Sequence, residues 1–166
     1  MLIHQAPSAE VATQAGFARW VEPHWAAMAA LAARAGQDSD DVLQEALTVA
    51  WRKRHRFDPA RGSARNWLLA LTADQRRKHW RSLAGRRETP GQVPESGSSD
   101  SYPCVDLERA LEALSKRQRL AVELHYYLGL GIADVAEVMR CAPGTVKSTL
   151  ADARNKLKDI LGGDYL

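Results

Sequence analysis

Apolar residues recur at steps of three and four through the first third of the chain, the spacing that forms one buried stripe on an α-helix. Over residues 17–32 this pattern predicts a single helix that ends near Gly36. A second apolar stripe over residues 42–51 predicts another helix. Asp38 is expected to cap its N-terminus, and Asp41 stands three residues further on, as in a capping box. The chain is therefore expected to start with two amphipathic helices.

The stretch FDPARGS, residues 57–63, interrupts the helical pattern with a proline and a glycine, which favour turns. Ser63 suits the N-cap of a third helix, because its hydroxyl can accept a hydrogen bond from a free amide of the first turn. That helix contains a further apolar stripe and ends in the basic run RRKHWR, residues 76–81. Trp51 and Trp67 lie on apolar stripes, so we expect both in the core.

The C-terminal part repeats this organisation on a smaller scale. DLERALEAL, residues 106–114, predicts a short amphipathic helix, and Ser115 is expected to cap the next one. A turn flanked by two glycines leads into IADVAEVM, a helix of about two turns. The last helix is predicted from Pro143 to about Leu161. No segment of the sequence alternates like a strand, so the predicted fold class is all-α.

Residues 84–104, between these two parts, are rich in Gly, Pro and Ser and lack apolar periodicity. This composition predicts a flexible linker, which at about twenty residues spans roughly 25 Å on average. We therefore expect two small helical domains, residues 8–83 and residues 105–163, joined by this linker.

Several classes of protein are excluded by composition. The longest apolar run, residues 25–33, is much shorter than the roughly 20 residues of a membrane-spanning helix. No targeting signal is recognisable, so we expect a cytoplasmic chain without membrane insertion. Cys104 and Cys141 are read as free thiols, and no Cys/His cluster indicates a metal ion or cofactor. The five histidines are scattered singly and no catalytic motif is present, so we expect no enzyme and no catalytic residues.

Charge is distributed unevenly along the chain. Residues 48–87 carry 12 Lys and Arg against 2 Asp and Glu, whereas residues 106–166 carry 9 of each. The formal net charge is only +3, so this one block supplies most of the positive field. Such a block is typical of a surface that binds a polyanion. The alternative is that these side chains lie on solvated helix faces that bind no partner.

The end of the chain matches a helix-turn-helix, because a two-turn helix and a sharp turn lead into a longer helix at Pro143. On a helical wheel, Val146, Leu150, Ala153 and Leu157 share one face, and the opposite face is small or polar. An ordinary surface helix of a small bundle is the alternative. The candidate DNA contacts are Thr145, Ser148, Asp152 and Asn155 for base edges or phosphates, and Lys147, Arg154 and Lys156 for phosphates.

Two quoted stretches resemble a known family. DSDDVLQEALTVAWR followed by FDPARGSARNWLL resembles the second conserved region of RNA polymerase sigma factors of the extracytoplasmic function (ECF) type. LEALSKRQRLAVELHYYLGLGIADVAEVMRCAPGTVKS resembles their fourth conserved region. The resemblance implies that the chain binds core RNA polymerase and promoter DNA. It implies further that the second region opens the −10 element, that the fourth reads the −35 element as duplex, and that an anti-sigma factor is a partner.

The resemblance also places functional residues. Asp41, Gln44 and Glu45, on the polar side of the second helix, are expected to face the polymerase clamp; favourable placement in the helix dipole is the alternative. Strand opening requires cations and aromatic rings close together, because an extruded base must be restacked and its backbone held. The expected phosphate contacts are Arg76, Arg77, Lys78 and Arg81, and the expected stacking rings are His79 or Trp80.

Several positions depart from the family pattern, among them Thr149, Ala151 and Asp152 on the last helix, where Arg or His is common. Asp74 and Lys78 stand where an Asn and an Asp are usual, so the location of the −10 contacts is carried over but not their chemistry. Arg140 stands where a Gly is usual, and Ala142 where a Ser N-cap is usual. Two alternative functions therefore stay open: a free helix-turn-helix regulator, and a sigma-like protein that binds polymerase or an anti-sigma factor without initiating transcription.

Overall fold

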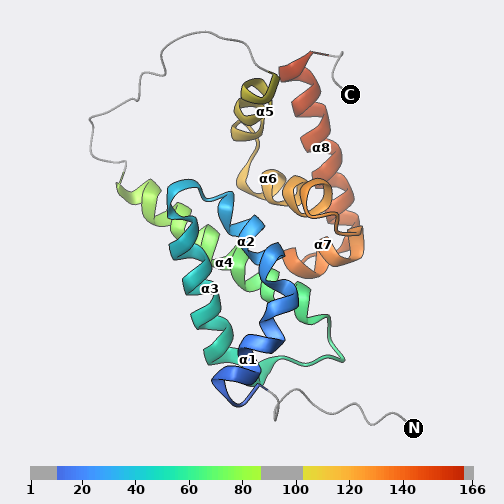
Figure 1. Cartoon of the computed structure of the whole chain (residues 1–166). Coiled ribbons are helices and arrows are strands. Elements are labelled where there is room, and N and C mark those ends of the chain that lie inside the picture. The colour runs from blue at the N-terminus through green and yellow to red at the C-terminus, as the bar shows by residue number, and fades with distance from the viewer. Residues whose placement is uncertain (1–10, 87–102, 163–166) are drawn as a thin grey trace. The chain divides into compact units, whose positions relative to one another are not determined.

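In a computed structural model, residues 11–86 and 103–162 are described, and all the regular secondary structure within them is helical (Figure 1). The chain divides into two compact units, one comprising the residues up to Ser82 and the other most of the residues after it. The expected all-α fold class is thus confirmed. None of the helices in the described residues is long and apolar enough to cross a membrane.

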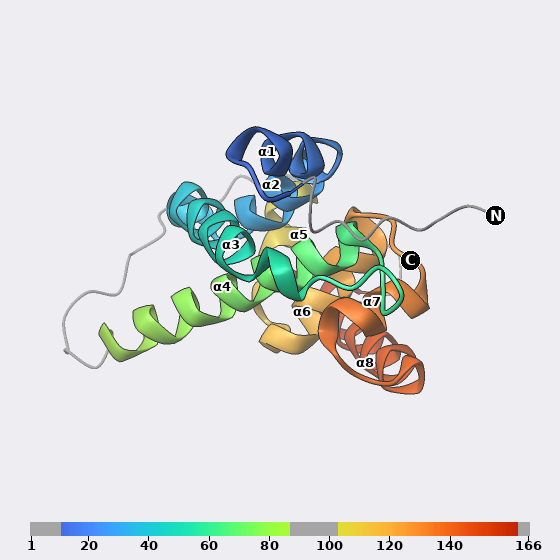
Figure 2. The same cartoon turned by 90° about the horizontal axis from the view of Figure 1, so that it is seen from below.

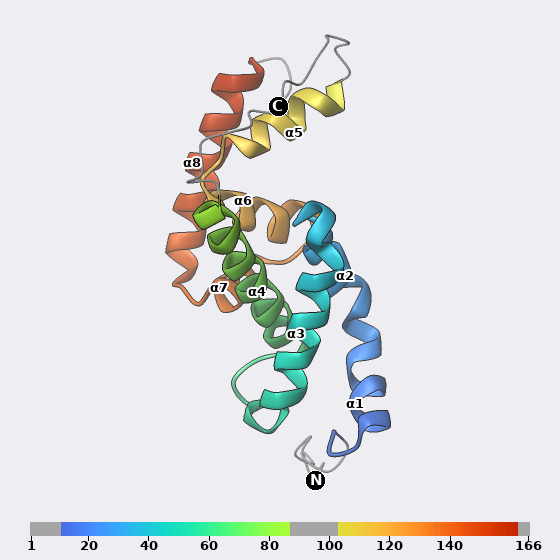
Figure 3. The ribbon, with the colours of Figure 1, turned by 90° about the vertical axis from the view of Figure 1, so that its left-hand side faces the viewer.

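The first predicted helix is broken in two. Helix α1, Gln14–Val21, is followed by a 3₁₀ turn, Glu22–His24, and then by α2, Trp25–Ala33 (Figure 3). The prediction of one continuous helix was wrong because of Pro23, which has no amide hydrogen to donate and whose ring crowds the preceding turn. The apolar stripe nevertheless continues across the break, since Phe17 and Met28 are both buried.

Helix α3, Ser39–Lys53, begins after a second 3₁₀ turn, Gly36–Asp38. Asp38 occupies the N-cap position, but its side chain makes no capping hydrogen bond. Its Oδ2 lies instead 2.9 Å from Nε2 of His79 on a later helix. The capping-box prediction for Asp38 was therefore wrong, because the carboxylate has a tertiary partner.

Helix α4, Ala64–Arg86, is the longest of the described helices and runs without interruption (Figure 2). Its N-cap is as predicted, since Ser63 Oγ accepts a hydrogen bond from the Asn66 amide at 3.1 Å. The helix extends three residues into the predicted linker, and α5 begins at Pro103, so that its first two residues also lie within the predicted linker. The helical segments on both sides are therefore longer than predicted. The remainder of the predicted linker lies outside the described residues, and the domain boundaries stay a prediction.

The core of the first unit is an apolar layer between α1, α2, α3 and α4, lined with a group of aromatic rings. The Trp20 ring lies at the centre of this group, with its centroid 5.3 Å from that of Phe57 and 5.9 Å from those of Phe17 and Trp67. Trp51 and Trp67 pack against the core as expected. Its buried members are Phe17, Val21, Met28, Ala46, Ala50, Leu68 and Leu71.

Within residues 103–162, the second unit contains four α-helices. They are α5, Pro103–Glu112; α6, Lys116–Val122; α7, Ile132–Met139; and α8, Pro143–Leu161. A π-helical turn, Glu123–Tyr127, extends α6. Ser115 caps α6 as predicted, in a full capping box with Gln118. Helix α8 packs against α5 and α6, with Ala153 and Leu157 joining Ala110, Leu111 and Leu114 in one apolar cluster.

Arg140, in the turn between α7 and α8, has a φ of +52°, in the left-handed region. This conformation explains why a glycine suits the position, since a side chain with a Cβ adopts it at a cost of roughly 1–2 kcal/mol. We predict that Arg140→Gly raises the free energy of unfolding of the second unit by up to about 1 kcal/mol, because the added flexibility of the unfolded chain offsets part of the gain. Urea denaturation followed by circular dichroism measures the change. Arg140→Ala keeps the Cβ and is the control, so an equal gain in that variant would contradict this explanation.

Candidate nucleic-acid interface

Helix α8 has the two faces that the helical wheel predicts. Val146, Leu150, Ala153 and Leu157 are all buried against the rest of the unit. The N-terminus of the helix has no side-chain cap, because Ala142 occupies that position. Pro143 compensates in part, since its missing amide hydrogen is one that the first turn would leave unpaired. The burial of one complete stripe leaves the opposite face of α8 to the solvent.

The candidate base contacts on α8 are exposed: Thr145, Ser148, Asp152 and Asn155. Two hydroxyls nearby are already committed as donors, since Ser148 Oγ and Thr149 Oγ1 both donate to the Thr145 carbonyl, at 3.0 and 2.7 Å. Ser148 therefore offers its oxygen mainly as an acceptor. Asp152 is also an acceptor, so a base partner for either side chain must present a donor, as the amino group of cytosine does.

The candidate phosphate contacts Lys147, Arg154 and Lys156 are exposed as well. One of them has a defined orientation, because Arg154 Nη1 donates to the hydroxyl of Tyr126 at 3.3 Å. The Tyr126 ring packs edge-on against His125, with centroids 4.7 Å apart, and His125 Nδ1 lies 2.7 Å from the Leu130 carbonyl. Sequence reasoning missed this support, although the aromatic pair in HYYL was a visible signal.

The basic run on α4 separates into two faces. Arg77, Lys78 and Arg81 are exposed, and Arg77 forms an ion pair with Asp74. Arg76 is only 1% exposed, donates from Nη1 to the Leu31 carbonyl at 3.3 Å, and places its guanidinium 4.4 Å from the centroid of the Trp80 ring. The expectation that Arg76 contacts a phosphate was therefore wrong.

Helical periodicity explains this separation. Residues 76, 79 and 80 fall within about 100° of one another on the helix, and residues 77, 78 and 81 fall on the other side. His79 is paired with Asp38, so its ring stacks on a base only if that contact breaks. Trp80 is half-buried over Arg76. Of the two candidate stacking rings, His79 thus lies against a carboxylate, whereas Trp80 lies over a guanidinium.

The candidate clamp-facing residues Asp41, Gln44 and Glu45 are exposed on α3. Two of them, Asp41 and Glu45, line a hollow of about 190 Å³ between α3 and α4. Its opposite wall carries Lys78 and His79 from α4. The hollow therefore has carboxylates on its α3 side and basic side chains on its α4 side. After its α3 residues, we call it the acidic end of the α3–α4 groove.

A second hollow, of about 380 Å³, lies between the C-terminal end of α3 and the same helix α4. Gln75 lines both hollows, so they share one groove. Sequence reasoning did not single out this part of the basic block, although the run WRKRHR, residues 51–56, marks it. We call it the basic end of the α3–α4 groove, and its lining consists of Val49, Arg52, Lys53, His55, Arg56 and Gln75.

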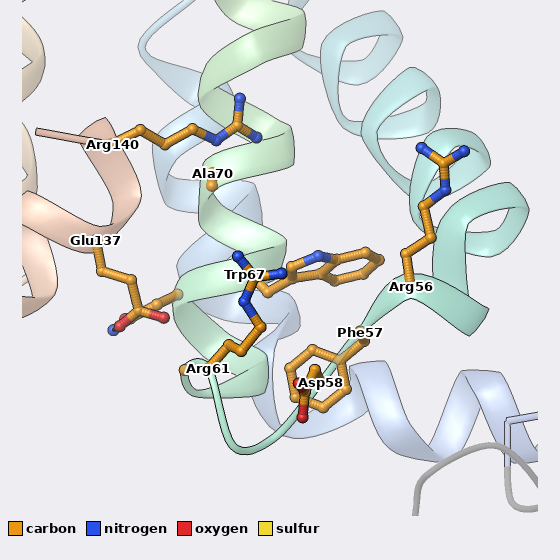
Figure 4. Close-up of a pocket in the computed structure, with 10 residues that line it drawn as sticks. Arg56, Phe57, Asp58, Arg61, Trp67, Ala70, Glu137 and Arg140 are labelled. Carbon is orange, nitrogen blue, oxygen red and sulfur yellow. Dashed lines mark hydrogen bonds between the residues drawn. The ribbon is translucent and has the colours of Figure 1, made fainter.

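The loop that follows is held by a turn and by stacked rings. Asp58 Oδ1 accepts a hydrogen bond from the Ala60 amide at 2.9 Å, which is an Asx-type turn. The Phe57 and Trp67 centroids are 5.7 Å apart, and Figure 4 shows Arg56 and Arg61 on either side of these rings. Aromatic rings and cations are therefore gathered at the start of α4.

Nothing in the described residues forms a metal site, because no three His, Cys, Asp or Glu side chains cluster there. Partial burial, together with the positive charge of Arg65, lowers the pKa of the His24 imidazole below its usual value of 6.5. This ring is therefore mainly neutral at neutral pH. His24 therefore adds little to the positive field of the first unit.

Both units match known families. Residues 21–86 match the family described as Sigma-70 region 2, and residues 104–157 match Sigma-70, region 4. Among solved structures, the sigma factor RpoE in complex with the anti-sigma factor NepR from Bartonella quintana has a TM-score of 0.72 and 27% identity, covering 89% of this chain and 98% of that one. CnrH in complex with the cytosolic domain of CnrY has a TM-score of 0.69 and 25% identity, covering 95% and 96%.

Sequence relatives agree with these structures. The ECF RNA polymerase sigma factor SigM of Mycobacterium tuberculosis is 33% identical over 147 residues, which is 81% of this chain and 70% of the relative. SigC from the same species is 37% identical over 126 residues, covering 72% and 68%. SigK of Mycolicibacterium vanbaalenii is 30% identical over 135 residues, covering 75% and 69%. Because it has both conserved regions in order and relatives of this kind at 30–37% identity, the chain belongs to the ECF family of RNA polymerase sigma factors.

Proposed function

We propose that the chain binds core RNA polymerase and directs promoter-specific initiation, reading a −35 element with α8 and melting a −10 element with the first unit. The observation that carries the proposal is the division of α8 into a buried apolar stripe and an exposed polar face flanked by three cations. Such a helix suits a major groove, where side chains reach base edges and flanking cations hold phosphates. The family consists of transcription initiation factors, which are not enzymes.

The −10 function is assigned to the exposed face of α4. Arg77, Lys78 and Arg81 share that face and would hold the backbone of an opened strand. Trp80 is the candidate ring for an extruded base, and a base stacked on such a ring contributes roughly 1–3 kcal/mol. Asp74 forms an ion pair with Arg77 and so partly neutralises the charge of that cation.

Binding of core polymerase is assigned to Asp41, Gln44 and Glu45 on α3. Their exposure, two of them at the edge of a groove, supports a docking role. The two structural neighbours were solved with an anti-sigma factor and with the cytosolic domain of CnrY. We propose that this chain likewise has an inhibitory protein partner and that it acts in the cytoplasm.

Two variants separate the two binding functions. Asp41→Lys with Glu45→Lys is expected to weaken binding to core polymerase at least tenfold, because charge reversal opposes a complementary interface. Lys147→Gln with Arg154→Gln and Lys156→Gln should keep core binding and lose run-off transcription from a promoter mapped by RNA-end sequencing during overproduction of the chain. Each variant is the control for the other. No specific transcript from any mapped promoter with the unmodified chain would refute the proposed function.

A non-initiating sigma-like protein is the second candidate, because Asp74 and Lys78 stand where the family usually has an Asn and an Asp, and Asp74 is engaged in an ion pair with Arg77. Such a protein would bind core polymerase but leave the promoter closed. Permanganate reactivity of unpaired thymines in the promoter complex distinguishes the two, since only an initiating factor makes the −10 region reactive.

A further inference from the structure

We propose that a hollow between α1, α2 and α3 is the docking site of the N-terminal segment of the same chain, residues 1–10, with Leu2 and Ile3 as the side chains that fill it. The hollow has a volume of about 520 Å³ and lies entirely within the first unit. Most of its α1 wall precedes residue 21, where the match to Sigma-70 region 2 begins. The inference does not depend on the proposed function.

The lining of the hollow is mainly apolar. Helices α1 and α2 follow one another along one side of α3, and all three contribute to the wall (Figure 3). Trp25, at the start of α2, is 48% exposed. Exposed apolar side chains that are gathered in a hollow, unlike scattered ones, mark a surface that binds something. The apolar lining residues are Phe17, Ala18, Val21, Trp25 and Leu47.

The charge and the size of the hollow favour a short apolar segment as its occupant. Its polar lining residues are Gln14, Arg19 and Glu22, so one cation is balanced by one anion. A nucleic acid gains little from such a surface, because phosphate neutralisation dominates its affinity. Only eight residues line the hollow, whereas a standard protein–protein interface uses about 20–30 residues a side. A second copy or a separate protein would therefore need contacts beyond the hollow, and a short segment of this chain would not.

The N-terminal segment joins the first unit beside the hollow. Val11 is only 2% exposed, and its carbonyl accepts a hydrogen bond from Arg54 Nε at 3.0 Å. Thr13 Oγ1 accepts a hydrogen bond from the Gly16 amide at 3.1 Å and so fixes the start of α1. Gln14, the next residue, already lines the hollow. The chain before Val11 therefore starts from a fixed point at one end of the hollow.

The segment is long enough and carries suitable side chains. The hollow extends from the start of α1 to Trp25, which is at most about 17 Å at 1.5 Å per helical residue. Ile3 precedes Val11 by eight residues, which reach about 28 Å when extended. In the segment MLIHQAPSAE, the large apolar side chains are the first three. Leu2 and Ile3 can therefore reach any part of the hollow and, by docking there, remove apolar surface from water.

The test uses the full chain labelled with 5-fluorotryptophan, because ¹⁹F NMR then gives one resonance for each of the five tryptophans. Trp25→Phe assigns the resonance of Trp25. Leu2→Ser with Ile3→Ser should weaken docking at least about tenfold, since both side chains lose the apolar surface that they bury. The Trp25 resonance should then shift and be broadened more by a soluble gadolinium chelate. His4→Ser with Gln5→Ser, in the same segment, is the matched control and should leave the Trp25 resonance unchanged.

A change in the wall of the hollow tests the same contact from the other side. Ala18 is exposed and lines the hollow, so Ala18→Glu places a charge there without disturbing the core. It should expose Trp25 to the chelate as the serine pair does. Ala26→Glu is the control, because Ala26 is exposed on α2 and does not line the hollow.

A peptide of residues 1–10 tests whether the segment itself is recognised. Added to the chain that carries Leu2→Ser with Ile3→Ser, it should return the Trp25 resonance toward its position in the unmodified chain. The same peptide with serine at positions 2 and 3 should bind at least about tenfold more weakly.

Three results would overturn the proposal. One is a Trp25 resonance that is identical in the unmodified chain and in the serine pair. Another is an equal change in the His4 and Gln5 control, which would mean that the apolar side chains are not recognised. The third is a Trp25 resonance of the unmodified chain that moves on dilution, which would assign the hollow to a second copy of the chain.

The proposed function and this docking site can fail separately. Core polymerase binding should be unchanged in the serine pair, because Leu47 lies about 200° around α3 from Glu45, one of the candidate clamp-facing residues. Failure of the unmodified chain to bind core polymerase would refute the proposed function and leave the NMR result intact. Loss of core binding in the serine pair, with an unchanged Trp25 resonance, would assign the segment to the polymerase and overturn the docking site alone.

Discussion

Trp20→Ala is expected to lower the free energy of unfolding of the first unit by about 3 kcal/mol, the lower end of the range for buried aromatic residues because the ring is half-buried. The Trp20 ring contacts Phe17 in α1, Phe57 in the loop and Trp67 in α4. Its removal leaves a cavity where three segments meet. We therefore expect the loop after α3 to lose its anchor together with the stability of the unit.

Urea denaturation followed by tryptophan fluorescence measures this change selectively, because all five tryptophans precede residue 87. Trp25→Ala is the matched control, since that ring is 48% exposed and the same atoms are removed. It should cost less than about 1 kcal/mol. Equal costs for the two variants would show that the aromatic group around Trp20 does not act as a packed centre.

Arg119→Met is expected to destabilise the second unit by about 3 kcal/mol. The Nε of Arg119 lies 3.0 Å from Oε1 of Glu123, one helical turn further on, and Glu123 is only 1% exposed. Removing one member of a buried ion pair leaves the other charge desolvated without its partner, which costs several kcal/mol. The effect should be confined to the second unit, since both residues belong to α6 and its π-helical extension.

The double variant Arg119→Met with Glu123→Leu tests this explanation. Replacing both charges by apolar side chains removes the desolvation cost along with the attraction, so its stability should return to that of the unmodified chain or exceed it. Hydrogen exchange of the α6 peptides measures both variants without interference from the first unit. A double variant that is less stable than Arg119→Met alone would contradict the assignment and point to a specific role of the Glu123 carboxylate.

Much of the local structure follows from periodicity and capping. The four apolar residues predicted for the buried face of α8 are all buried, because a rotation of about 100° per residue places them together in any α-helix. Ser63 and Ser115 cap their helices because their partners lie only three residues away. The break at Pro23 was equally local, and its missing amide hydrogen was a sufficient signal.

Side chains whose partners lie far along the chain could not be assigned in this way. Asp38 was expected to cap α3, but it pairs with His79, which is 41 residues later. Arg76 was expected to meet a phosphate, but it donates to Leu31, 45 residues earlier. Composition marked the whole basic run as a binding surface, whereas packing turned one side of it toward α2 and α3.

Hydrophobic periodicity, turn residues and the two conserved stretches were thus enough to establish the helical class, the family and the faces of α8. The packing of α3 against α4 decided which cations are exposed and where a groove lies. The physical reason is that a helix forms through contacts within a few residues. The choice between a solvent-facing and a paired arginine depends instead on carbonyls, carboxylates and rings that only the folded chain brings near.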